Sequence, residues 1–218
     1  MKVVAKYLSN IALEKRILIE ELELSEFYSF YSNELDELRS MCNALIGGKR
    51  TGGRLKSLKI DNKVSLNEHS VGFKDCITLE TISLELYDDL NKGTFLLARH
   101  FSGCKSLKSI ILRESNTHSR HYTVDGVLYG SHILIKYPAN KGTEFTIPAN
   151  VDQIGNLAFE DSQLTTLTFT NPIPATCEED AFKGVNPATL VIRVPKGCHD
   201  SFWAHPVFGK FKIEEMDV

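Results

Sequence analysis

Apolar residues recur in short alternating blocks along the chain. The clearest block runs from Phe101 to Leu112, where an aromatic residue and a small turn precede the pattern Leu-x-x-Ile-x-Leu. Because side chains alternate across a β-strand, Ile110 and Leu112 point to one face of a short strand and the residues between them to the other. One such strand cannot bury its apolar face alone, so the pattern predicts copies above and below it.

The same block is repeated along the chain. The copy that begins at Leu79 follows Phe73 at the same spacing as Leu107 follows Phe101. Other copies begin at positions 19, 55, 164 and 190, and a weaker one is Phe145-x-Ile147-Pro148. Most steps fall near the roughly 20 to 29 residues of a leucine-rich repeat. The chain is therefore predicted to be a solenoid, in which each rung contacts only its neighbours.

One region departs from this period. Residues 122–129 place Asp125-Gly126 between alternating apolar residues, which is a strong signal for a β-hairpin. Residues 133–138 are the expected next strand, after a turn at Gly130-Ser131. We therefore expect a strand pair inserted within the stack.

Helices are expected near the N-terminus. Residues 3–13 have apolar residues at helical spacing, and we interpret them as a cap over the first rung, whose strand is residues 17–24. Residues 32–45 have a second helical face, with Ser32 as its N-cap. The glycine-rich residues 46–53 lack the phosphate-loop pattern and are expected to be a surface loop. The predicted fold class is α/β, a leucine-rich-repeat solenoid with a mainly parallel sheet, an inserted β-hairpin and a helical N-terminal cap.

We expect one domain over residues 1–218. Its parts are an N-terminal cap and first repeat (1–54), regular repeats (55–114), a hairpin-containing repeat (115–148), further repeats (149–197) and a C-terminal cap (198–218). The aromatic residues 201–213 lack the period, which is the basis for the C-terminal cap.

Composition and charge narrow the function. With 25 basic and 28 acidic residues the net charge is −3, which does not favour a nucleic-acid partner. No apolar run is long enough to span a membrane, and charged residues interrupt any signal-peptide core near the start. The chain is then either cytosolic or a mature form whose export signal has been removed.

The five cysteines are scattered at positions 42, 76, 104, 177 and 198, without a C-x-x-C motif. This spacing does not favour a zinc site or a redox motif. Cys76 and Cys104 occupy the same point of adjacent rungs, where a buried cysteine acts as a small apolar filler. A disulfide is the less favoured alternative for these two, and the pairing of any of Cys42, Cys76, Cys104, Cys177 and Cys198 is left open.

The repeat resembles the BspA-type leucine-rich repeat family of surface and secreted proteins from Bacteroides-like bacteria. Ile154-Gly-Asn-Leu-Ala-Phe159 and the block from Phe101 to Leu112 are similar to the two halves of its rung, and residues 122–129 are similar to its hairpin variant. The resemblance covers nearly the whole chain. It implies an extracytoplasmic, non-catalytic binding or adhesion module, at the cell surface or secreted, and it names no ligand.

The outward residues of the strands are the candidate partner-binding face. Parallel strands place such residues in ladders across one sheet, and solenoids bind ligands on such surfaces. The face comprises Ser57, Lys59, Asp61, Thr81, Ser83, Glu85, Ser109, Ile111, Arg113, Thr166, Thr168 and Thr170, with Glu21, Glu23, Val191 and Arg193 at its ends. The competing interpretation is that small polar residues only keep the sheet soluble. The tyrosines Tyr122, Tyr129 and Tyr137 are a second candidate, and packing of the hairpin is favoured for them.

No motif indicates catalysis, and neither a cofactor nor a metal is expected. His118 and His121 lack further ligands at metal-binding spacing, and His199-Asp200-Ser201 are adjacent in sequence instead of converging from separate positions. The expected function is a non-catalytic binding or adhesion module of an exported bacterial protein, which recognises a protein or a glycan. The alternatives are a structural spacer within a longer surface protein and, less favoured, an enzyme with an unrecognised site.

Overall fold

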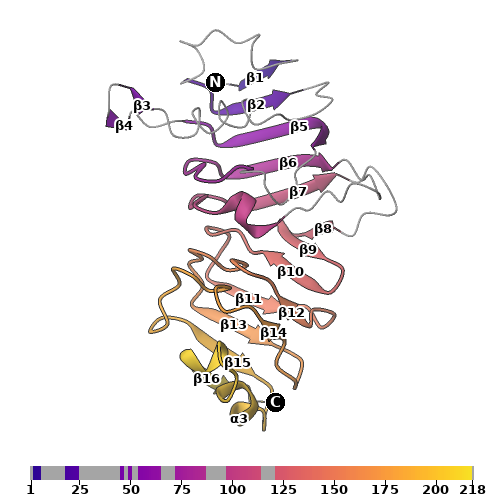
Figure 1. Cartoon of the computed structure of the whole chain (residues 1–218), viewed down its shortest axis with the longest axis vertical. Coiled ribbons are helices and arrows are strands. Elements are labelled where there is room, and N and C mark those ends of the chain that lie inside the picture. Colours follow the sequence, from indigo (N-terminus) through magenta and orange to yellow (C-terminus); the bar gives the residue numbers. More distant parts are fainter. Residues whose placement is uncertain are drawn as a thin grey trace.

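The computed structural model describes residues 2–5, 18–24, 45–46, 49–50, 54–64, 72–86, 97–113 and 121–217. Within these ranges the chain forms an elongated stack of short strands, with the first and last strands at opposite ends (Figure 1). Most neighbouring strands are parallel. The architecture is therefore a β-solenoid of the leucine-rich-repeat kind, as the repeat predicts.

Sheet A contains the N-terminal rungs. Its strands are, in spatial order, β1 (Lys2–Ala5), β2 (Glu21–Leu24), β5 (Ser57–Val64), β6 (Thr81–Leu86) and β7 (Ser109–Arg113), all parallel. Ile82 pairs with Ile110 in register, and both side chains are completely buried. The alternation in the sequence therefore assigns the inner face of this sheet correctly.

Sheet D contains the C-terminal rungs. Its parallel strands are β11 (Glu144–Ile147), β13 (Thr166–Phe169), β15 (Val191–Val194) and β16 (Lys212–Glu215). Strand β16 lies in the segment expected to be the C-terminal cap, so sheet D has one more strand than the sequence pattern indicates. The helix α3 (His199–Trp203) and the 3-10 turn η3 (Phe208–Lys210) precede it, and they bury Phe202 and Phe208 against Phe169 in β13.

Sheet C contains the predicted hairpin, which is confirmed. Strand β8 (His121–Val124) pairs antiparallel with β9 (Val127–Gly130), and β9 pairs antiparallel with β10 (Ile133–Lys136). The two-residue strands β12 (Gln153–Ile154) and β14 (Thr176–Cys177) continue from β10 in parallel. Both turn residues of the hairpin have positive φ, +48° at Asp125 and +74° at Gly126, as a type I′ turn requires.

The hairpin separates sheet A from sheet D. The backbone N–H of Ile110 in β7 donates to the carbonyl of Gly126 at 3.0 Å. A Cβ at Gly126 would lie 2.4 Å from the Ser109 hydroxyl oxygen, so only glycine allows the turn to approach β7 this closely. The expectation of one outward ladder across one sheet is therefore wrong, because the hairpin turn occupies the edge of β7 where the next parallel strand would pair.

Strand β9 is buried on both of its faces. Leu128 belongs to the hydrophobic cluster under sheet A, whereas Val127 and Tyr129 belong to the cluster under sheet D. All four residues of this strand are buried. Alternation along one short strand thus divides the interior of the solenoid into two cores.

A column of aromatic residues follows the return side of the rungs. Phe73 and Phe101 stack with their ring centroids 5.9 Å apart, and Phe159 and Phe182 stack at 4.9 Å. Tyr137 lies beside Phe159 at 5.6 Å. Backbone hydrogen bonds join successive returns, such as Phe73 N–H to the His100 carbonyl and Tyr137 N–H to the Ala158 carbonyl. Each aromatic residue of this column therefore marks one rung, and the number of residues between two of them is the length of a rung.

The residue before each aromatic is small in the C-terminal rungs, Ala158 and Ala181, but it is a lysine at position 136. Lys136 is only 2% exposed, and its ammonium donates to the Leu157 carbonyl at 3.0 Å. It also lies 3.7 Å from the buried carboxylate of Glu160, which accepts a hydrogen bond from the Ser102 hydroxyl at 2.9 Å. We call Lys136, Glu160 and Ser102 the junction cluster, because it links the Phe101 rung to the Phe159 rung.

The helical part of the sequence prediction is not supported. Residues 3–5 lie in strand β1, not in a helix, and residues 6–17 and 32–44 lie outside the described ranges. Residue 45, expected at the end of the second helix, lies in the short strand β3 (Leu45–Ile46), which pairs antiparallel with β4 (Lys49–Arg50). The only α-helix among the described residues is α3, with five residues, so these ranges form a β-solenoid instead of an α/β fold with a helical cap.

Candidate functional site

Outward side chains of sheet A form rows, because its strands pair in register. One row contains Glu21, Ser57, Thr81 and Ser109, and the next contains Glu23, Lys59, Ser83 and Ile111. Apart from Glu21 and Ile111, these side chains are half-buried by their neighbours. Ile111 is the apolar member of this face, with 42% of its surface exposed. The structure therefore places most of the predicted N-terminal residues together on one surface.

A bulge in β5 changes the third row. The register between β5 and β6 shifts between Lys59 and Lys63, so Lys63 and not Asp61 pairs with Glu85. The guanidinium of Arg113, two strands away, donates to the carbonyl of Ile60 within this irregular stretch. This contact satisfies the Ile60 carbonyl of β5, so Arg113 stabilises the sheet in addition to being a residue of the predicted face.

Ion pairs between rungs satisfy the charges of sheet A. The Lys59 ammonium lies 2.5 Å from the Glu23 carboxylate in the next strand. Just before β6 and β7, Lys108 donates to Glu80 at 2.7 Å, and this hydrogen bond lowers the pKa of the Glu80 carboxyl. Charges that are already paired across the sheet have less to offer a partner. On the sheet A face the charges of Lys59 and Glu23 are therefore already paired within the sheet.

The sheet D face is rich in threonine. Thr146, Thr168, Arg193 and Glu214 form one row, and Glu144, Thr166, Val191 and Lys212 form the other. Lys212 lies 2.6 Å from Glu214 on the edge strand, which lowers the pKa of the Glu214 carboxyl. Thr166 and Thr168 lie here as predicted, and Thr170 follows the end of β13 with its side chain exposed.

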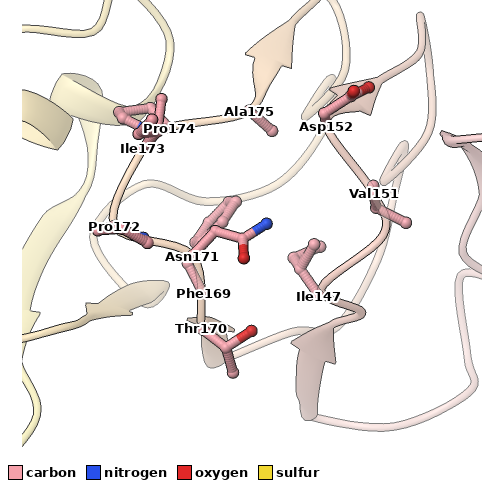
Figure 2. Close-up of a pocket in the computed structure, with 10 residues that line it drawn as sticks. All are labelled: Ile147, Val151, Asp152, Phe169, Thr170, Asn171, Pro172, Ile173, Pro174 and Ala175. Carbon is pink, nitrogen blue, oxygen red and sulfur yellow. The ribbon is translucent and has the colours of Figure 1, made fainter.

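An apolar hollow opens at the carboxyl ends of β11 and β13. Its volume is about 310 Å³, and two loops enclose it (Figure 2). The lining residues are Ile147, Val151, Asp152, Phe169, Thr170, Asn171, Pro172, Ile173, Pro174 and Ala175. Asn171 donates from its side-chain amide to the Ala149 carbonyl at 2.9 Å, and this bond holds the two loops together. We call this feature the strand-end hollow.

Ile173 projects at the rim of the strand-end hollow. Its side chain is 77% exposed, the most exposed of the large apolar side chains in the described part of the chain. Pro172 and Pro174 restrict the backbone on either side of it, because a proline ring fixes φ. The sequence carried a signal for this feature, an isoleucine between two prolines after a strand, but its position beside a hollow depends on the fold.

The hairpin tyrosines serve mainly in packing. Tyr129 and Tyr137 are 2% and 1% exposed. Tyr122 stacks on Tyr129 with ring centroids 5.3 Å apart and donates from its hydroxyl to the Ser131 carbonyl at 3.1 Å. Burial raises the pKa of the Tyr137 phenol to about 12. The packing interpretation of Tyr129 and Tyr137 is therefore confirmed.

The other residues weighed from the sequence form no reaction centre within the described ranges. His199 and Asp200 lie 3.1 Å apart, but the Ser201 hydroxyl donates to the Cys198 carbonyl instead of the imidazole. His118 lies outside these ranges, and His121 belongs to β8. Among the described residues no three His, Cys, Asp or Glu side chains are grouped to hold a metal.

The described cysteines are free thiols. Cys76 and Cys104 are buried in the sheet A core, and the Cys104 thiol donates to the Phe73 carbonyl at 3.0 Å. The filler interpretation of these two residues is confirmed. Burial raises the pKa of both the Cys104 and the Cys177 thiols, to about 12 for Cys177, so neither is an activated nucleophile at neutral pH. Cys42 lies outside the described residues.

Comparison with known proteins matches a family model over part of the chain and gives no function. No curated protein matches the chain. A solved leucine-rich repeat protein from Eubacterium ventriosum is 18% identical, with a TM-score of 0.45 over 82% of this chain and 48% of that one. The pneumococcal vaccine antigen PcpA is 14% identical, with a TM-score of 0.33 over 92% of this chain and 68% of that one. The chain thus spans about half the length of the Eubacterium protein.

In the described part of the chain no helix is long and apolar enough to cross a membrane.

The family match falls within the C-terminal rungs. The model of the BspA type leucine rich repeat region matches residues 137–199 in six copies. This segment runs from Tyr137 in the aromatic column to the start of α3. The chain therefore carries a BspA-type leucine-rich repeat region, as its sequence resemblance predicts.

Proposed function

We propose that the chain is a non-catalytic binding and adhesion module of an exported bacterial leucine-rich repeat protein. It recognises a protein or a glycan at a cell surface or in a matrix. We assign it to the cell surface or the secreted fraction because its rungs resemble those of surface and secreted proteins. We assign it no catalysis because the described ranges contain no converging set of reactive groups.

The strand-end hollow supports this proposal most directly. The predicted face contains no aromatic anchor of the kind that dominates many binding surfaces. Thr170, the last residue of that face, lines the hollow, and Ile173 adds an exposed apolar side chain at its rim. Polar threonine rows beside a small apolar hollow provide the two elements of a binding surface, a rim of hydrogen-bonding groups and an apolar centre.

Arrays of matrix proteins and of glycans probed with the purified chain test this function. We expect at least one partner to bind, and Thr170→Arg and Ile173→Asp each to weaken its binding by about tenfold, since each puts a charge in the lining of the apolar hollow. Both side chains are exposed, so the melting temperature should stay that of the parent.

Val124→Asp is the matched control. Val124 is also an exposed apolar residue, at 53%, but it lies in the hairpin and does not line the hollow. It should bind like the parent. Binding that survives Thr170→Arg and Ile173→Asp would exclude the sheet D face, and failure of the parent on both arrays would favour the spacer alternative.

A further inference from the structure

A second cavity runs along the return side of the solenoid, away from the threonine rows. Its volume is about 570 Å³. Four successive rungs line this cavity, each with the residue four positions before its aromatic residue in the column. These residues are Leu97, Ile133, Gly155 and Glu178. We call it the return groove. Its course crosses the rungs, so it extends along the solenoid axis.

The floor of the return groove is aliphatic. Ile133, Ile135 and Leu157 line it and are half-buried. Gly155 lies between them, and a Cβ there would come within 3.3 Å of the Leu134 carbonyl. The absence of a side chain at this position therefore keeps the middle of the groove open. Gln153 and Asn156 add amide groups along the wall.

The two ends of the groove carry opposite charges. Arg99 in the 3-10 turn η2 (Ala98–Phe101) is exposed at one end, and Glu178 after β14 is exposed at the other. Three rung spacings separate them, which at about 4.8 Å per strand is about 15 Å. The aliphatic floor lies between the two charges.

Leu157 on the floor has a conformation that leucine rarely adopts. Its φ is +58°, in the left-handed region. Its carbonyl accepts the hydrogen bond from the buried ammonium of Lys136 at 3.0 Å. Backbone strain that the surrounding structure enforces is concentrated at binding sites. The hydrogen bond from Lys136 therefore helps to hold Leu157 in this conformation on the groove floor.

We propose that the return groove binds an extended peptide segment of a partner protein. The segment places an acidic side chain at Arg99, a basic side chain at Glu178 and a small apolar side chain on the floor between them. An extended chain advances about 3.3 Å per residue, so residues four apart span about 13 Å and their side chains complete the distance. The described lining contains no Phe, Tyr or Trp, so it offers a sugar no aromatic platform.

The test uses a fluorescein-labelled peptide, Gly-Asp-Ser-Val-Ser-Lys-Gly, in which Asp, Val and Lys share one face of the extended chain, and fluorescence anisotropy with the full chain. We expect binding, and roughly five- to tenfold weaker binding for peptides with two Asp or two Lys at the charged positions. R99E and E178R should each weaken binding of the original peptide by a similar factor. The double variant R99E/E178R should restore it, because an extended peptide can lie in either direction.

Two more variants distinguish binding in the return groove from binding elsewhere on the chain. Asn156→Trp fills the groove from an exposed position and should abolish binding, whereas Thr170→Arg at the strand-end hollow should leave it unchanged. All variants should melt like the parent. No binding of the peptide, or single charge reversals without effect, would overturn the proposal. So would an oligosaccharide that binds in the same assay, loses affinity in Asn156→Trp and is indifferent to R99E.

Discussion

The rungs before the hairpin and the rungs after it fill their cores with different kinds of side chain. Under sheet A the core is mainly leucine and isoleucine, with Cys76 and Cys104 as fillers. Under sheet D it is rich in aromatic rings, among them Phe159, Phe169 and Phe182. The difference extends to the surface, where sheet A pairs its charges between strands and sheet D presents threonines beside an apolar hollow.

The comparison teaches that one repeat can support two surfaces, because the inner and outer positions of a strand vary independently. The hairpin makes this division possible. Strand β9 gives Leu128 to one core and Val127 and Tyr129 to the other, so each core ends at its own side of the strand. The junction cluster then ties the two halves together on the return side.

The largest effect is expected from Ile110→Asp in the sheet A core. The Ile110 side chain is completely buried, and an unpaired carboxylate there has no compensating partner. The chain should lose its cooperative thermal transition, measured by circular dichroism. Ile111→Asp, one residue further and exposed, is the control and should melt within a few degrees of the parent. Parent-like melting of Ile110→Asp would show that the inner face of β7 is wrongly assigned.

The next effect concerns the junction cluster. Glu160→Ala leaves the Lys136 ammonium buried without its carboxylate, which should cost about 3–5 kcal/mol in the free energy of unfolding. Lys136→Met in the same background should recover most of this loss, because it removes the buried charge. Urea denaturation measures both. Equal stability of Glu160→Ala and the parent would show that the ion pair does not hold the halves together.

The pH dependence of the same pair follows from Lys136. Burial lowers the pKa of this ammonium below its ordinary value, so the unfolded chain binds the proton more tightly than the folded chain. Between the lowered pKa and the unfolded value of about 10.4, stability therefore rises with pH. Relative to Lys136→Met, which lacks this group, the parent should gain stability as the pH increases through that window. If the difference in unfolding free energy between the parent and Lys136→Met does not change with pH in this window, the pKa of Lys136 is not lowered.

The smallest effects are expected from substitutions on the two sides of β9. Leu128→Ala should destabilise the sheet A core and Val127→Ala the sheet D core, each by about 1–4 kcal/mol, with the larger loss for leucine. Hydrogen exchange should show faster opening of β6 and β7 in the first variant and of β13 and β15 in the second. The same pattern of opening in both variants would mean that the solenoid unfolds as one core.

Much of the fold could be predicted from local alternation. The inner residues of β7 and the aromatic return column lie where the repeat puts them, and the hairpin turn lies at Asp125-Gly126, where the Asp-Gly signal puts it. The helix expected over residues 3–13 was wrong at its start, because the apolar spacing there fits both periods. The β-branched Val3 and Val4 were the signal for a strand, and pairing with β2 decides the outcome.

The candidate surfaces were less predictable. The outward rows follow from alternation, but the sequence could not show that a bulge in β5 would replace Asp61 by Lys63 opposite Glu85. Nor could it show that the loops after β11 and β13 enclose a hollow, because their contact depends on the stacking of two rungs. The binding role of the predicted face stays a prediction.

The sequence by itself determined which residues point inward in each strand, because a period of two depends only on neighbouring residues. It also determined the order of rungs through the repeated aromatic. Only the tertiary structure decided that Lys136 is buried at a position that holds alanine in the following rungs. The physical reason is that a charge tolerates burial only with partners, and the Glu160 carboxylate and the Leu157 carbonyl reach Lys136 from the next rung once the solenoid has formed.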